Sequence, residues 1–112
     1  MIMITGGSFQ GKTEYARAQY PDREIIVHFE EQILQCIREN RDPSAYTGQF
    51  IESHPDAVVL MDEIGNGIVP VDREERAWRE AAGRAGCRLA KEAGEVYRVM
   101  AGIGIKIGRA HV

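Results

Sequence analysis

Apolar residues occur in short runs that predict strands. Residues 1–5 and 57–61 are almost unbroken aliphatic runs, as expected for buried strands of a parallel sheet. Residues 24–29 are rich in β-branched residues and predict a further strand, residues 95–101 predict another, and residues 103–107 predict a last short one.

Between these runs, three segments have the composition and periodicity of helices. Residues 12–20 are good helix formers that stop before a proline. Residues 30–40 place apolar side chains at helical spacing, with acidic residues in the first turn. Residues 73–93 predict a long charged helix, in which Gly83 and Gly86 each cost about 1 kcal/mol relative to alanine.

The other segments are punctuated by turn residues. Residues 42–47 predict a turn, 48–53 a weak helix or loop, and 64–72 a loop rich in glycine. Strands that alternate with helices indicate an α/β fold with a small, mostly parallel sheet and helices on both faces. We expect one domain over residues 1–112, and a sheet this small leaves surface for another subunit.

The first strand leads into a glycine-rich loop that matches the phosphate-loop pattern G-x-x-x-x-G-K-[ST] at every defined position. The loop consists of Gly6, Gly7, Ser8, Phe9, Gln10, Gly11, Lys12 and Thr13. Its backbone N–H groups and the following helix N-terminus suit a phosphate, the lysine suits the β- and γ-phosphates, and the threonine hydroxyl suits Mg²⁺. The alternative is a glycine turn that precedes Lys-Thr by chance.

A second acidic feature follows the run at 57–61, where Asp62 and Glu63 end the predicted strand. Strand C-termini gather at the ligand-binding edge of a parallel sheet, so these carboxylates are candidates for Mg²⁺ together with Thr13. Adjacent strand residues point to opposite faces, so only one of the two is expected to face the metal. The alternative is an exposed acidic pair in a loop.

Composition narrows the class of protein. The net charge is -3, which argues against binding nucleic acid through bulk positive charge. No apolar run approaches the roughly 18 residues of a membrane span, and no signal peptide is recognisable, so we expect a cytoplasmic protein. Cys36 and Cys87 lack metal-ligand spacing and are interpreted as reduced packing residues.

From residue 62 onward the sequence resembles a known family. Residues 62–70, D-E-I-G-N-G-I-V-P, look like the N-E-V-G-x-G-I-V-P signature of the adenosylcobinamide kinase/adenosylcobinamide-phosphate guanylyltransferase family of cobalamin biosynthesis. R-A-W-R-E at 76–80, followed by Gly83, is similar to that family's R-x-F-R-D-x-x-G. A-G-E-V at 93–96 and A-G-I-G-I-K at 101–106 resemble its A-D-E-V and A-G-L-P-L-K.

The resemblance implies a P-loop fold, phosphorylation of the cobinamide aminopropanol hydroxyl with ATP or GTP, transfer of GMP, and a homotrimer. Lys12 and Glu63 are then the candidate catalytic residues, with Thr13, Asp62 and Glu63 around Mg²⁺. Four residues are candidates for contacts to substrate or to a neighbouring subunit: Gly65, Gly67, Arg76 and Arg79. The alternative for the arginines is a solvated helix face.

The chain also departs from the family. Members are longer and contain R-I-x-x-H-x-x-x-R-P, whose histidine carries the guanylyl group, and a strand with V-D-C. Residues 30–40 hold no histidine, and we interpret His28 as a strand residue, His54 as a loop residue and His111 as a tail residue. We therefore expect that the guanylyltransferase step is lost, and one interpretation of Asp62 is that it replaces the missing carboxylate.

Three functions stay open at this point. The leading one is a Mg²⁺-dependent phosphotransferase resembling adenosylcobinamide kinase. The second is a non-catalytic nucleotide-binding or assembly module derived from that family. The third is NTP hydrolysis coupled to a partner protein.

Overall fold

The computed structural model describes residues 1–64 and 72–108, and within them the chain forms one five-stranded sheet in the order β2-β3-β1-β4-β5. Strands β1 to β4 are parallel, and β5 runs antiparallel to β4 at one edge. The strands are β1 (Ile2–Gly6), β2 (Ile25–Ile26), β3 (Val58–Asp62), β4 (Glu95–Met100) and β5 (Ile103–Gly108). This confirms the predicted mostly parallel sheet.

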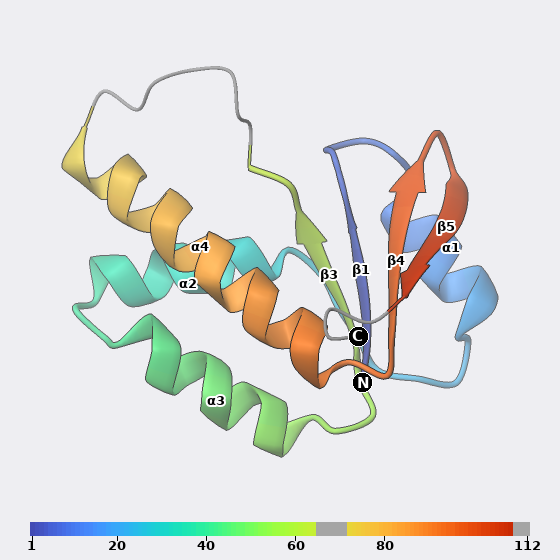
Figure 1. Cartoon of the computed structure of the whole chain (residues 1–112), viewed down its shortest axis with the longest axis horizontal. Coiled ribbons are helices and arrows are strands. Elements are labelled where there is room, and N and C mark those ends of the chain that lie inside the picture. Colours follow the sequence, from blue (N-terminus) through green and yellow to red (C-terminus); the bar gives the residue numbers. More distant parts are fainter. Residues whose placement is uncertain (65–71, 109–112) are drawn as a thin grey trace.

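Helices cover both faces of the sheet (Figure 1). Helix α1 (Lys12–Gln19) lies on one face. The other face is covered by α2 (Phe29–Arg38), α3 (Pro43–Ser53) and α4 (Arg73–Glu92). The α/β class, with helices on both faces, is thus as the sequence predicts.

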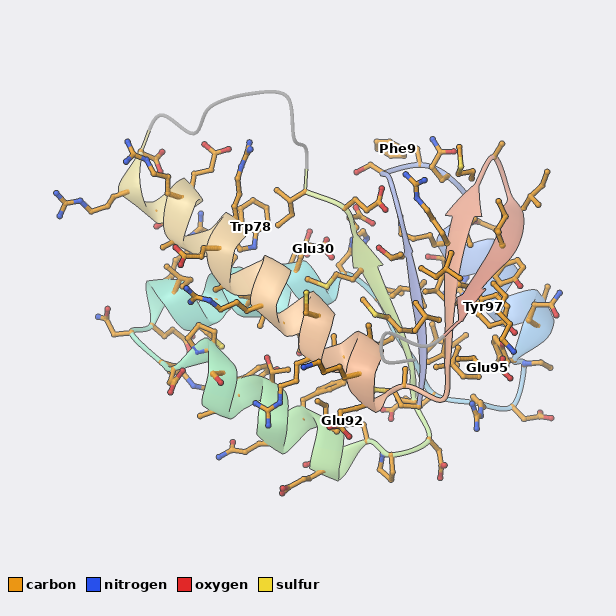
Figure 2. All side chains as sticks on the ribbon, viewed as in Figure 1. Phe9, Glu30, Trp78, Glu92, Glu95 and Tyr97 are labelled. Atoms are coloured by element: carbon orange, nitrogen blue, oxygen red, sulfur yellow. The ribbon has the colours of Figure 1, made fainter. Side chains whose placement is uncertain are left out.

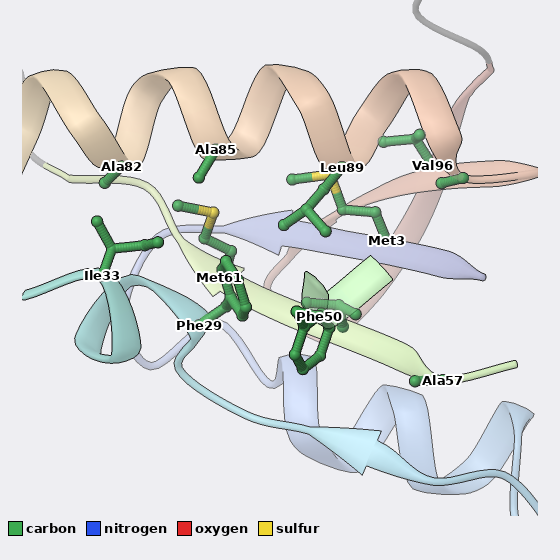
Figure 3. Packing of buried hydrophobic residues seen from close by; sticks show 12 residues of the cluster. Met3, Phe29, Ile33, Phe50, Ala57, Met61, Ala82, Ala85, Leu89 and Val96 are labelled. Atoms are coloured by element: carbon green, nitrogen blue, oxygen red, sulfur yellow. The ribbon is translucent and has the colours of Figure 1, made fainter. Parts of the chain in front are cut away.

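The sheet is buried on both sides because alternate strand residues enter two separate cores. Ile2 and Ile4 of β1 pack with Ala16 of α1. Met3, between them, enters the larger cluster under α4, which also contains Leu89 (Figure 3). Burial of both faces explains why β1 and β3 are continuous apolar runs rather than alternating ones.

Two predicted segments are wrong. The strand predicted over 24–29 ends at Ile26, and Phe29 instead begins α2, because its fully buried ring packs against Phe50 of α3. The turn predicted over 42–47 is instead helical, and it forms one helix, α3, with residues 48–53, for which the helical alternative is confirmed. Its start is fixed by Asp42, whose carboxylate accepts a hydrogen bond of 2.9 Å from the Ser44 N–H, with proline at the first helical position.

None of the helices within the described ranges has the length and apolar character that crossing a bilayer requires. Gly65, Gly67 and His111, which the sequence proposes as candidate or unassigned residues, lie outside the described residues, as does most of the loop predicted at 64–72.

Candidate functional site

The glycine-rich loop joins the end of β1 to the start of α1, and two of its glycines are required by the backbone. Gly6 has φ 154°, and a Cβ there would lie 2.5 Å from the carbonyl oxygen of Val99. Gly11 has φ 86°, and a Cβ there would lie 3.2 Å from the Cα of Gly102. A residue with a side chain would therefore be strained at either position, which explains the spacing of the motif.

The loop is held in place by the turn between β4 and β5. The carbonyl of Gln10 accepts a hydrogen bond of 2.7 Å from the Gly102 N–H, and its side-chain Oε1 accepts one of 2.7 Å from the Ala101 N–H. Phe9, at the loop tip, is fully exposed (Figure 2). The anchoring role of Gln10 was not predicted, because it depends on a hairpin at the other end of the chain.

Lys12 is buried, and its ammonium makes two close contacts. Its Nζ lies 2.6 Å from Oδ1 of Asp62 and donates to the Gly7 carbonyl at 2.6 Å. The Ser8 hydroxyl donates to the other oxygen of Asp62 at 3.1 Å. Residues of the loop, Thr13 and Asp62 line a pocket of about 240 Å³. The structure thus brings the lysine, the threonine and one carboxylate together.

The two adjacent carboxylates at the end of β3 face different partners. Asp62 faces the glycine-rich loop. Both oxygens of Glu63 instead accept hydrogen bonds of 3.0 Å from the guanidinium of Arg98 on β4. This is the opposite-face arrangement that strand geometry predicts, and only the structure identifies Asp62 as the one beside Lys12.

The oxygen-rich donor set of this pocket suits a hard divalent cation. Thr13 and Asp62 offer a hydroxyl and a carboxylate, which Mg²⁺ prefers as ligands beside phosphate oxygens. A second group of candidate ligand atoms, on His28, Glu30 and Glu31, lies within 4.8 Å of one another.

His28 is a correction to the sequence-based interpretation, which placed it on a strand. It is the residue that precedes α2, in the left-handed conformation with φ 53°. Its side chain is about half exposed and lines the same pocket as Lys12 and Asp62. Its Nδ1 lies 3.2 Å from Oε2 of Glu30 and 3.8 Å from Oδ2 of Asp62.

Glu30 is the site residue that sequence reasoning missed. Its side chain is buried, and its Oε1 accepts a hydrogen bond of 2.9 Å from the backbone N–H of Asp62. Its carbonyl accepts one of 2.7 Å from Nε1 of Trp78 on α4, and the two residues lie side by side in Figure 2. The only sequence signal was an acidic residue in the first turn of a helix, which the helix dipole already explains.

A second cavity, of about 370 Å³, lies between the sheet and α4. Met3, Met61 and Gly83 line its apolar part, and Asp62 and Arg79 line its polar rim. Arg79 also donates to Glu75 at 3.2 Å. Arg76 is exposed on the same helix. Asp62 therefore borders both this cavity and the pocket of the glycine-rich loop.

The remaining candidates lie away from the loop. His54 ends α3, where its Nδ1 lies 3.0 Å from the Phe50 carbonyl and its ring stacks on that of Phe50. Both cysteines are free. Cys36 is a buried packing residue as predicted, whereas Cys87 is exposed, so its interpretation as a packing residue was wrong.

The sequence of this chain is similar to a known protein family. A model of the cobinamide kinase / cobinamide phosphate guanyltransferase family matches residues 34–107. Two proteins named "Bifunctional adenosylcobalamin biosynthesis protein CobU" are similar over 50 residues, 45% of this chain. The one from Salmonella typhimurium is 52% identical and the one from Escherichia coli 50% identical. The aligned segment is 28% of each relative, so the chain matches only a minor part of their length.

Proposed function

Because the chain belongs to the cobinamide kinase / cobinamide phosphate guanyltransferase family, we propose that it is a Mg²⁺-dependent phosphotransferase. It binds ATP or GTP at the glycine-rich loop and transfers the γ-phosphoryl group to a hydroxyl of a cobinamide-type acceptor. The observation that supports this most is the pair formed by Lys12 and Asp62, since it places a phosphate-binding cation and a metal-binding carboxylate in one pocket.

In this proposal, separate groups in the pocket bind the phosphates and Mg²⁺. The loop N–H groups bind the phosphates, and the ammonium of Lys12 neutralises charge on the β- and γ-phosphates. Thr13 and Asp62 hold Mg²⁺, which would supply charge neutralisation at the transferred group. Glu63 acts indirectly in this proposal, because both oxygens of its carboxylate bind the guanidinium of Arg98 on β4.

The acceptor occupies the second cavity in this proposal. The cavity is apolar beneath α4 and polar where Asp62 borders the phosphate pocket, so a bound acceptor would present a polar end to the γ-phosphate. Its volume falls at the lower end of the range for small-molecule sites, so it suits one arm of a large acceptor rather than the whole molecule.

The guanylyltransferase step is absent in our proposal. His28 lies before α2 and lines the pocket, so its position does not support this absence. The support comes from α2, whose residues Phe29–Arg38 include no histidine. Intact-protein mass spectrometry after incubation with GTP and Mg²⁺ tests it, and an acid-labile mass increase of one GMP would refute it.

The second candidate function is a non-catalytic nucleotide-binding module, favoured by the small share of the relatives' length that this chain covers. NTP consumption measured with and without adenosylcobinamide separates the two. The phosphotransferase predicts consumption that depends on the acceptor and is lost in Lys12→Ala. Nucleotide binding without any consumption would instead establish the module, and consumption that ignores the acceptor would indicate hydrolysis.

A further inference from the structure

Glu30 is a buried carboxylate with both oxygens engaged at the edge of the phosphate pocket. Its side chain is 4% exposed; Oε1 accepts from the Asp62 N–H at 2.9 Å, and Oε2 lies 3.2 Å from Nδ1 of His28. Because a carboxylate only accepts hydrogen bonds, this contact places the proton of the neutral imidazole on Nδ1. Nε2, on the far side of the ring, is then a hydrogen-bond acceptor.

The ring of His28 has the exposure that a proton acceptor needs. Its side chain is 51% exposed and lines the pocket formed by the glycine-rich loop, Lys12 and Asp62. Within residues 1–64 and 72–108, no protein group makes a hydrogen bond to Nε2. Proton exchange with solvent is therefore open to this nitrogen after each turnover.

The charged groups that face the ring are mostly acidic. Oδ2 of Asp62, on β3, lies 3.8 Å from Nδ1, and a carboxylate oxygen of Glu31, on α2, lies within 4.8 Å of the same group of atoms. The opposing charge is Lys12, at the start of α1, whose ammonium is paired with the other oxygen of Asp62. Three carboxylates, counting Glu30, thus face one imidazole, with the nearby cation already neutralised.

We propose that His28 is the general base of the proposed phosphoryl transfer and that Glu30 is the residue that positions it. The inference rests on the proposed function. The acceptor oxygen forms a bond to the γ-phosphorus while the bond from that phosphorus to the β–γ bridging oxygen breaks. The nucleoside diphosphate leaves with the bonding electron pair, and the hydroxyl proton moves to Nε2 of His28.

Asp62 is the competing candidate for the base, and its contacts argue against it. One oxygen is paired with the Lys12 ammonium and the other accepts from the Ser8 hydroxyl. Both oxygens of this carboxylate are therefore engaged, and in the proposed function they also hold Mg²⁺, which leaves neither free to take the acceptor proton. His28 has no such duty.

The first test is the rate of acceptor phosphorylation by the whole chain. We expect His28→Asn to lower kcat about 10²- to 10⁴-fold, as for loss of a general base. Nucleotide affinity should be unchanged. His54→Asn is the matched control, because that ring lies on Phe50, away from the pocket, and should leave kcat unchanged.

The second test needs no turnover. Long-range ¹H–¹⁵N NMR spectra should show His28 as the Nδ1–H tautomer in the unmodified chain. Glu30→Gln should reverse it to Nε2–H, because a glutamine has one acceptor oxygen, which the Asp62 N–H takes, and must offer its NH₂ to the ring.

The outcomes separate the two proposals. An unaltered kcat in His28→Asn, or an Nε2–H tautomer in the unmodified chain, would overturn the base while leaving the phosphotransferase in place. Nucleotide binding without any phosphorylation in the unmodified chain would overturn the phosphotransferase and the base together. A GMP adduct on His28 would make the ring a nucleophile and also overturn its role as base.

Discussion

The ammonium of Lys12 and the carboxylate of Asp62 lie 2.6 Å apart across the gap between the glycine-rich loop and the end of β3. Both side chains are largely shielded from water, which strengthens their attraction. In our proposal, nucleotide phosphates compete for the same ammonium. Binding would therefore exchange one anionic partner of Lys12 for another and release a carboxylate oxygen for Mg²⁺.

Lys12→Ala should weaken nucleotide binding. The substitution removes the side-chain charge nearest the proposed β- and γ-phosphates, so we expect a loss of about 1.5 to 3 kcal/mol, as for other hydrogen bonds to charged groups. Isothermal titration with ATP and GTP measures it. Lys91→Ala, an exposed lysine near the end of α4, is the control for the change in net charge. Equal affinities in both variants would remove the basis of the phosphate-loop assignment.

The neighbours Asp62 and Glu63 should differ in their effect on Mg²⁺. Asp62→Asn removes a charge from the pocket, so the Mg²⁺ concentration needed for half-maximal nucleotide binding should rise about tenfold or more, which corresponds to about 1.4 kcal/mol. Glu63→Gln should change it much less, because that carboxylate is engaged by Arg98. Titration of Mg²⁺ at fixed nucleotide checks both. A larger effect from Glu63→Gln would reverse the assignment of the metal ligand.

Gly83→Leu should block the proposed acceptor cavity without harming the fold. A Cβ at Gly83 meets no heavy atom within 4 Å, and leucine is favoured over glycine inside a helix by up to about 1 kcal/mol. The KM for the acceptor should therefore rise while nucleotide affinity and thermal stability are retained. Glu80→Leu, exposed on the same helix, is the matched control. An unchanged KM in the Gly83 variant would place the acceptor elsewhere.

Strand β5 should contribute to a homo-oligomer. It is an edge strand, and alternate residues Ile103, Ile105 and Ile107 are 66%, 49% and 56% exposed. Within residues 1–64 and 72–108 no further strand pairs with β5, and an apolar row on an edge strand is a common site of association. Light scattering at micromolar concentration should find an oligomer, which is a trimer by the resemblance noted above. Ile105→Glu should dissociate it, whereas Lys106→Ala should not. A monomeric unmodified chain would exclude this role.

The two thiols should react at different rates. Cys36 is 1% exposed, and its burial raises the pKa of the thiol, so little thiolate is present at neutral pH. Cys87 is exposed on α4. A disulfide reagent should therefore modify one thiol of the native chain quickly, and Cys87→Ser should abolish that phase. Rapid modification of both thiols before unfolding would contradict the packing of α2.

Some elements depend on local sequence, and these are the ones that could be predicted. The glycine-rich loop is specified by its own residues, since Gly6 and Gly11 adopt backbone angles that other residues rarely adopt. Strands β1 and β3 could be predicted because burial on both faces leaves a continuous apolar run. The start of α3 is also encoded locally, in Asp42 and the proline that follows, but the same residues are typical of turns, so composition alone does not distinguish the two.

Tertiary structure decided where the remaining site residues lie. The apolar run that ends at Phe29 is compatible with either a strand or a helix start, and the packing of Phe29 against Phe50 selects the helix and puts His28 in the pocket. Strand alternation alone requires Asp62 and Glu63 to face opposite ways. Which of the two carboxylates contacts Lys12 depends on the position of β3 beside β1. That position is set by pairing between strands that are distant in sequence, and it decides which side chain at the end of β3 faces the glycine-rich loop.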